Sequence, residues 1–197
     1  MGIWDSLFGK SKAKKTENSP FFPKQDDPLD VGFAKNFTSK GGKFLFNEIK
    51  SNLAENFKNI CIENNWEPKH IISLDNSLSN EFGAGLISQK SASLKAYSAA
   101  LINCEYLISN TGKILLSEYQ IKHFKLVDLP QTIIVKANIN QLVRDVSQGM
   151  TLLKNKYPKK IPTNITTLKI RSDSEEEKQA DKSGTSSKSI YLLLEDK

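Results

Sequence analysis

The chain has 197 residues, 38% of them hydrophobic and 25% charged, which is the composition of one globular domain with an extension. Its longest apolar runs are four or five residues, far below the ~18 that a membrane-spanning helix requires. The formal net charge is +6, but half of it falls in residues 1–25, where five lysines face Asp5 and Glu17. Because this is a basic extension and not a basic domain face, we expect no nucleic-acid partner.

Residues 1–28 are predicted to form a short helix and a basic linker. The linker, from residue 9 onward, is rich in Lys, Ser, Asp and Pro. The short helix could dock on the domain, on a partner or on a membrane surface; its apolar residues are Ile3, Trp4, Leu7 and Phe8. The basic residues follow the apolar ones, unlike in a secretory signal, so we expect a cytoplasmic protein.

Residues 29–197 are predicted to form the domain, and its first element is a helix. Asp27 and Pro28 are a helix-start signal. Every fourth residue from Leu29 to Phe37 is apolar, which gives the helix one apolar face. The glycines at 41 and 42 are expected to end it.

A strand–helix–strand unit follows. Residues 43–46 and 70–74 have the composition of strands, and an amphipathic helix capped by Asn47 lies between them. A helical crossover predicts that the two strands pair in parallel and that the architecture is α/β. Residues 75–95 are predicted to be a loop with one or two helical turns. The apolar residues 96–103 suit either a buried strand or a tightly packed helical turn.

The densest apolar stretch of the chain is residues 104–136. Its runs YLIS and KILLS flank a polar turn, Ser109 to Gly112, with the composition of a hairpin loop whose glycine is left-handed. We expect this antiparallel hairpin beside the parallel strands, in one mixed sheet. A further strand is predicted at 132–136.

The last third of the domain is predicted to contain one helix and two strands. Asn138 and Gln141 resemble a capping box, and the apolar residues from Ile139 to Leu153 follow a helical repeat. Strands are expected at 164–170 and 189–196, the second inside the sheet, and a mobile loop at 171–188. The expected fold is α/β with three layers, a mixed and mostly parallel sheet flanked by helices.

Known catalytic and metal-binding motifs are missing from the sequence. His70 and His123 have no second ligand at a metal-site spacing, and neither GxSxG nor GxxxxGK[ST] occurs. Cys61 and Cys104 are too few for a disulfide framework or an iron–sulfur cluster, so we expect two buried, unpaired side chains. We therefore expect neither a metal nor a cofactor.

Two polar clusters are candidates for binding a small anion. Asn110, Thr111 and Gly112 offer N–H groups and a hydroxyl at a strand end, with Ser117 nearby, and backbone nests of this kind hold phosphates and carboxylates. The second cluster precedes the last strand and contains Ser187 and Lys188. The alternatives are an ordinary hairpin turn and a flexible loop.

An ordered series of short motifs resembles the LUD domain, the bacterial lactate-utilisation family. The series is AALINCEYLISNTGKILLS, LPQTIIVK, QLVRDVSQGM, IPTNIT and SSKSIYLLLED. The likeness covers residues 29–196 and is greatest to short stand-alone members of Bacteroidetes-type bacteria.

The resemblance implies a fold similar to the sugar-isomerase and CoA-transferase-like α/β proteins. It also implies a role in oxidation of lactate, a 2-hydroxy acid, beside iron–sulfur partner subunits. Without cluster-binding cysteines, the chain looks like a non-redox accessory component that binds a small anionic ligand or those partner subunits.

The sequence departs from the family pattern at three places. Asn110 stands where the family typically has an acidic residue before Thr-Gly. EYQIKHFK replaces the family's polar, glycine-rich segment after the hairpin, and RSDSEEEKQADK replaces a motif of small and acidic residues. Because of these departures, we expect ligand binding to be altered or lost relative to the family.

Two alternative functions remain at this stage. A stand-alone isomerase or hydrolase acting on a phosphosugar or CoA ester would need an acid or base in its pocket, and Glu105, Glu118 and Asp128 are the candidates. An interaction module would instead use the segment from Trp4 to Phe8 to dock on a partner.

Overall fold

A six-stranded, entirely parallel sheet is the centre of the fold. The computed structural model describes residues 27–47, 50–87, 93–171 and 187–196. In spatial order the strands are β1 (Lys43–Asn47), β10 (Ser189–Glu195), β7 (Thr132–Asn138), β4 (Ala99–Asn103), β2 (Ile71–Ser73) and β3 (Gly85–Leu86). The predicted α/β class is confirmed, and β4 shows that the ambiguous run at 96–103 contains a strand.

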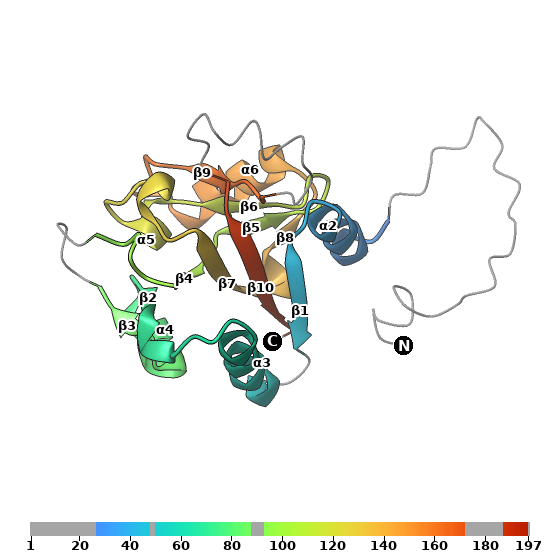
Figure 1. The fold of residues 1–197 in the computed structure, drawn as a ribbon. Coiled ribbons are helices and arrows are strands. Elements are labelled where there is room, and N and C mark those ends of the chain that lie inside the picture. The colour runs from blue at the N-terminus through green and yellow to red at the C-terminus, as the bar shows by residue number, and fades with distance from the viewer. Residues whose placement is uncertain (1–26, 48–49, 88–92, 172–186, 197) are drawn as a thin grey trace, which may run out of the picture.

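Helices cover one face of this sheet (Figure 1). They are α3 (Lys50–Glu63) and α4 (Asn76–Phe82), whose apolar side chains pack on the strands. The Asp75 carboxylate caps α4 by accepting from the Ser77 and Leu78 N–H groups, and Gly83 ends it in the left-handed region at φ 68°. The helical turn expected within 75–95 is therefore present.

A second, four-stranded sheet covers the other face of the parallel sheet. Its order is β8 (Leu142–Val143), β5 (Tyr106–Ile108), β6 (Lys113–Leu116) and β9 (Thr166–Leu168). The predicted hairpin, β5 and β6, is antiparallel and pairs Ile108 with Lys113. Our expectation that it would join the parallel strands in one mixed sheet is wrong. It packs on that sheet instead, because both faces of a parallel sheet must be covered.

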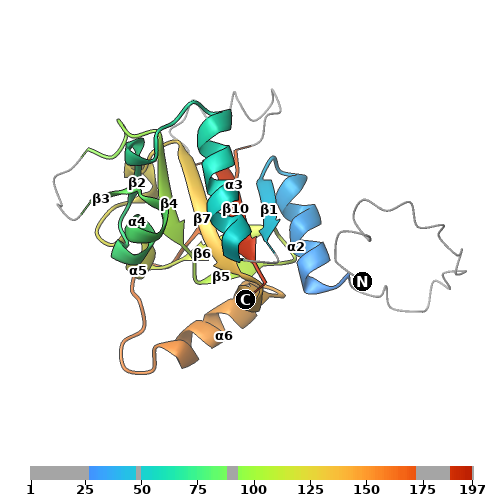
Figure 2. The same cartoon turned by 90° about the horizontal axis from the view of Figure 1, so that it is seen from below.

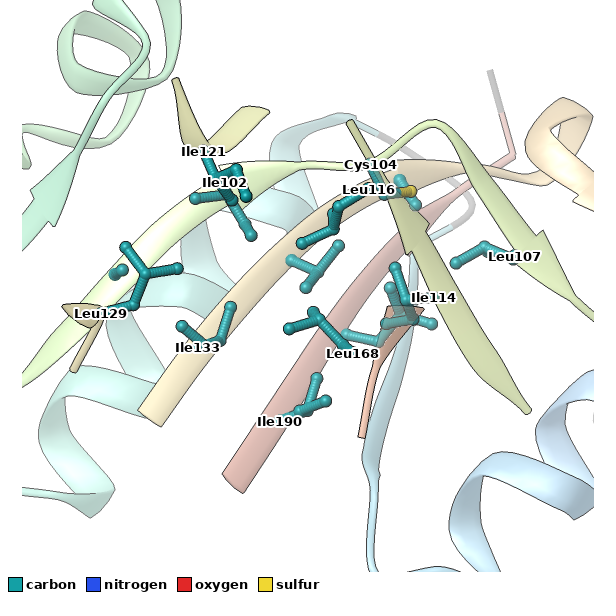
Figure 3. Packing of buried hydrophobic residues seen from close by; sticks show 14 of the residues in the cluster. Ile102, Cys104, Leu107, Ile114, Leu116, Ile121, Leu129, Ile133, Leu168 and Ile190 are labelled. Atoms are coloured by element: carbon teal, nitrogen blue, oxygen red, sulfur yellow. The ribbon is translucent and has the colours of Figure 1, made fainter. Parts of the chain in front are cut away.

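The contact between the two sheets is the larger part of the core. Figure 3 shows the side chains of Ile133 and Ile190, from β7 and β10, facing those of Ile114 and Leu116, from β6. All four are fully buried, and Leu168 of β9 lies in the same cluster. The hairpin is thus held by burial of its apolar face and not by pairing with the parallel strands.

The two strands expected to pair directly, β1 and β2, are separated by three others. Two of the places between them are taken by β10 and β7, strands whose apolar runs are nearly continuous because both of their faces are buried. The interior position predicted for the last strand is confirmed.

The capping box at Asn138 and Gln141 is present, but it does not open the long helix. It opens a 3-10 turn, Ile139–Gln141. The next two residues form β8, which pairs with β5. Helix α6 (Val146–Lys156) begins only after Asp145, whose carboxylate accepts from the Gln148 N–H. Leu142 and Val143 therefore pair with β5, although their spacing fits the predicted helix.

Helices α2 and α5 and two 3-10 turns are the remaining elements of the described chain. Helix α2 (Leu29–Thr38) follows Pro28 as predicted. The buried rings of Phe33 and Phe37 are stacked, with 5.4 Å between their centroids. The Asp27 side chain does not cap it but pairs with Lys35. The remaining elements are α5 (Glu118–Ile121) and the 3-10 turns Pro68–His70 and Leu126–Asp128.

Two sequence predictions cannot be compared with the structure. The N-terminal helix and nearly all of its linker, and most of the loop expected at 171–188, lie outside the described residues. Within the described ranges, every helix is too short or too polar to cross a bilayer.

Gly112 in the hairpin turn is a sharp test of this packing. It has φ 61°, and a Cβ atom there would lie 2.5 Å from the backbone N of Phe37 in α2. Gly83 is a matched control, since its φ is 68° but a Cβ would meet nothing within 4 Å. In urea unfolding, Gly83→Ala should lower the free energy of unfolding by about 1–2 kcal/mol. Gly112→Ala should cost about 2–5 kcal/mol; equal losses would contradict the packing.

Candidate functional site

The hairpin turn predicted to bind a ligand docks against α2. The Ser109 hydroxyl donates to the Leu29 carbonyl at 2.7 Å, and the Asn36 amide donates to the Ser109 carbonyl at 2.8 Å. The Lys40 ammonium group donates to the Thr111 carbonyl. Both carbonyls therefore already accept protein hydrogen bonds. The backbone N–H groups of Asn110 and Thr111, which we expected to bind an anion, already donate to the carbonyls of Arg144 and Ile108.

One polar atom of the turn has no partner. The Thr111 hydroxyl is buried and makes no hydrogen bond to any residue that the structure describes. Buried polar atoms are nearly always hydrogen-bonded, and an exception calls for an explanation. The Thr111 side chain does not line the neighbouring cavity.

A cavity of about 350 Å³ lies beside the turn, where three elements meet. Helix α2 contributes Gly32 and Asn36, the turn contributes Asn110, and the segment between β8 and α6 contributes Arg144. Gly32 permits the close approach, since a Cβ there would lie 2.8 Å from the Ser109 hydroxyl oxygen. The full lining is Asp27, Leu29, Gly32, Asn36, Ser109, Asn110, Arg144 and Asp145.

The charges around this cavity leave one cation without an anionic partner. The Asp27 carboxylate is paired with Lys35 at 2.7 Å, and the Asp145 carboxylate accepts from the first turn of α6. The exposed Arg144 guanidinium has no ion pair with any described residue. The cavity is therefore lined by one arginine without an ion pair and by two asparagines, residue types suited to a carboxylate or phosphate.

Ser117 belongs to a different place, the start of α5. Its side chain is fully buried and caps that helix by accepting from the Tyr119 N–H. Its hydroxyl donates to the Glu105 carboxylate at 2.6 Å. Ser117 therefore makes its hydrogen bonds within the protein.

Ser187 and Lys188 lie at the amino end of β10, apart from the hairpin turn and from Ser117. The Ser187 carbonyl accepts from the Gln131 amide at 3.1 Å, and the Lys188 ammonium group donates to the Leu129 carbonyl at 2.9 Å. Lys188 is buried, and burial lowers the pKa of its ammonium group. The structure thus distributes the six predicted residues over three locations, each with its own hydrogen-bond partners.

The three acids considered for an enzyme do not converge. Glu118 accepts from the Thr163 hydroxyl, and Asp128 accepts from the Lys125 N–H. Glu105 has a separate set of partners. Among the described residues, no two of these acids share a hydrogen-bond donor.

Glu105 is the centre of a buried network. Its side chain is fully buried and forms an ion pair with Lys156 of α6 at 2.8 Å. Burial raises the pKa of its carboxyl group, but the hydrogen bonds from Lys156 and Ser117 outweigh burial and hold that pKa below its ordinary value. The network ties the hairpin to α5 and α6, so its role is structural. The other donors are Gln120 and Tyr157.

The sequence reading missed a polar cluster at the carboxyl edge of the parallel sheet. The Lys136 ammonium group of β7 lies 2.9 Å from the Glu81 carboxylate and 3.9 Å from that of Glu195. A cavity of about 140 Å³ nearby is lined in part by Asp75 and Asn103. Ligands of open parallel sheets bind at this edge. The available signal was that polar residues, Asn103 and Glu195 among them, directly follow apolar strand runs.

The sequence reading also missed Arg144. It falls inside the pattern that we interpreted as a continuous helix, which would have placed it on an exposed helical face. A usable signal was its rarity, since the chain has only two arginines among its 28 basic residues.

Both cysteines are core residues. Cys61 and Cys104 are buried and unpaired, as expected, and burial raises the pKa of both thiols. Within the described part of the chain, no three His, Cys, Asp or Glu side chains are grouped so that they could hold a metal ion.

The Glu105 network predicts a pH-dependent stability. At pH 7, Glu105→Gln should lower the free energy of unfolding by about 1–3 kcal/mol. Because the folded pKa is lowered, this contribution is fully present above the unfolded value of about 4.3 and is lost as pH falls through the folded pKa. Urea unfolding from pH 7 to 3 checks this, with the half-buried Glu118→Gln as control. A wild-type-to-variant difference that persists at low pH would contradict it.

Comparison with known proteins identifies the family. The model of the LUD domain matches residues 32–193. Among solved structures, the chain is similar to a DUF162 family protein from Deinococcus radiodurans, with a TM-score of 0.60 and 15% identity, covering 85% of this chain and 96% of that one. That likeness shows a shared fold. The search of curated proteins found no match. The chain belongs to the LUD domain family, whose name refers to lactate utilisation.

Proposed function

We propose that this protein is a non-redox accessory component of lactate, or related 2-hydroxy-acid, utilisation, and that it binds a small carboxylate anion in the cavity beside the hairpin turn. The family name supports the pathway. The two buried cysteines support a non-redox role, because a four-iron cluster needs four thiolates. Electron transfer would be left to iron–sulfur partner subunits in the cytoplasm.

The observation that carries the proposal is Arg144 at the rim of the cavity. A guanidinium can donate two parallel hydrogen bonds to a carboxylate, which fixes the orientation of the anion as well as binding it. Asn110 and Asn36, which line the same cavity, provide side-chain amides that can donate to the second polar group of a 2-hydroxy acid.

The size of the cavity is compatible with a small ligand. Its volume of about 350 Å³ is at the lower end of the range of small-molecule sites, roughly 300–1,000 Å³. The apolar Leu29 at its wall gives the carbon chain of such a ligand a surface to contact.

Of the six residues predicted from the sequence, the proposal uses Asn110 as a ligand contact and Gly112 as the residue that shapes the turn, whereas Thr111 does not line the cavity. Ser117 does not line the cavity, and its hydroxyl donates to the Glu105 carboxylate instead. Ser187 and Lys188 would form a separate anion site at the amino end of β10, but the Lys188 ammonium group already bonds to a carbonyl.

The test is binding of L-lactate measured by isothermal titration calorimetry. Arg144→Gln removes one charge-assisted interaction of about 1.5–3 kcal/mol, so affinity should fall about 10- to 100-fold. Lys154→Gln on the exposed side of α6 makes the same change in net charge and should bind as the wild type does. Equal affinities of Arg144→Gln and wild type would contradict the site.

A second candidate function is an enzyme acting on a phosphosugar or CoA ester. The observation that favours it is the group of Lys136, Glu81 and Glu195 at the carboxyl edge, where an acid and a base lie side by side. Turnover that is lost in Lys136→Met but retained in Arg144→Gln would support this enzyme. Inactivity of the wild type towards both substrate classes would contradict it.

A further inference from the structure

The helical face of the molecule carries an apolar groove that the proposed ligand site does not use. Its volume is about 390 Å³, and it runs between α3 and α4. Figure 2 shows these two helices on the same side of the parallel sheet. The lining is mainly apolar and includes Phe57, Cys61, Ile62, Trp66 and Phe82.

Part of this groove is strongly exposed. Ile62 of α3 is 63% exposed, the largest value among the exposed large hydrophobic residues of the described chain. Such residues favour a partner that removes them from water. Lys58, one turn earlier on α3, also lines the groove and has no ion pair with the described residues.

A segment of the chain itself matches this surface. Ile3, Trp4, Leu7 and Phe8 lie at spacings that place them on one face of a helical turn. Asp5 lies among them and has the charge opposite to that of Lys58. The segment thus combines an apolar face with one carboxylate, and the groove combines an apolar floor with the Lys58 ammonium group. The Glu81 carboxylate also lines the groove, but it is paired with Lys136 at 2.9 Å.

The connection between the segment and the domain is long enough for docking within one molecule. Helix α2 begins at Leu29, and both α2 and α3 contact β1, which is an edge strand. Figure 2 shows α2 and α3 on either side of that strand. The 20 residues from 9 to 28 would span about 25 Å as a flexible linker and at most about 72 Å when extended. The linker needs only to pass around the β1 edge.

We propose that residues 3–8 dock into the groove between α3 and α4 of the same molecule, with Trp4 inserted among the apolar side chains and Asp5 directed to Lys58. This intramolecular contact covers Ile62. It is independent of ligand binding at the hairpin turn, on the opposite face of the parallel sheet.

Tryptophan fluorescence of the full chain tests this docking. The chain has two tryptophans, so in a Trp66→Phe background Trp4 is the only one. Docking predicts a blue-shifted Trp4 emission that acrylamide quenches several-fold less than in the same protein carrying Ile62→Lys. Leu152→Lys, on the surface of α6 and 38% exposed, is the matched control and should leave Trp4 protected.

Hydrogen exchange of the chain with Trp66 intact is the second measurement. Residues 3–8 should exchange more slowly than in the Ile62→Lys variant, and the protection should not depend on protein concentration. A solvent-exposed Trp4 in every variant, or protection that Ile62→Lys leaves unchanged, would overturn the proposal. Protection that appears only with dimerisation, or only with phosphatidylglycerol–phosphatidylcholine vesicles, would overturn it in favour of a second copy or a membrane surface.

Discussion

The apolar contact between the two sheets is the constraint on which the rest of the structure depends. Strands β7 and β10 are buried on both faces, so helices alone on one side cannot complete the core. The hairpin of β5 and β6 covers the second face, and α6 then covers the outer side of the hairpin (Figure 1). The turn at the end of the hairpin is therefore fixed in space, against α2.

This placement of the turn creates the candidate site. Strand β8 pairs with β5, which brings Arg144, the residue directly after β8, next to the turn. The Asn110 N–H donates to the Arg144 carbonyl at 3.0 Å and holds the two together. Close contact with α2 requires glycine at 32 and 112, and it supplies the Asn36 amide. The cavity beside the turn is thus a consequence of how the second sheet packs.

The local features of the fold could be predicted from the sequence because they depend on neighbouring residues. The hairpin, its left-handed Gly112 and the start of α2 after Pro28 are of this kind. The interior place of β10 was also predictable, since a nearly continuous apolar run needs two buried faces.

The features that depend on distant residues could not be predicted in the same way. The separation of β1 from β2, the second sheet and the late start of α6 all result from pairing between segments far apart in the chain. The same limit applies to the site. Asn110 could be predicted as a site residue from the composition of the hairpin turn. Its proximity to Asn36 and Arg144 could not, because it depends on the packing of three elements.

The central claim is that a small carboxylate binds between the hairpin turn, α2 and Arg144. The most direct measurement is an NMR titration of ¹⁵N-labelled protein with L-lactate. The account predicts that the shift changes concentrate on the side-chain signals of Asn36, Asn110 and Arg144. Changes concentrated around Asn103 and Lys136 at the carboxyl edge, or no saturable change, would contradict it.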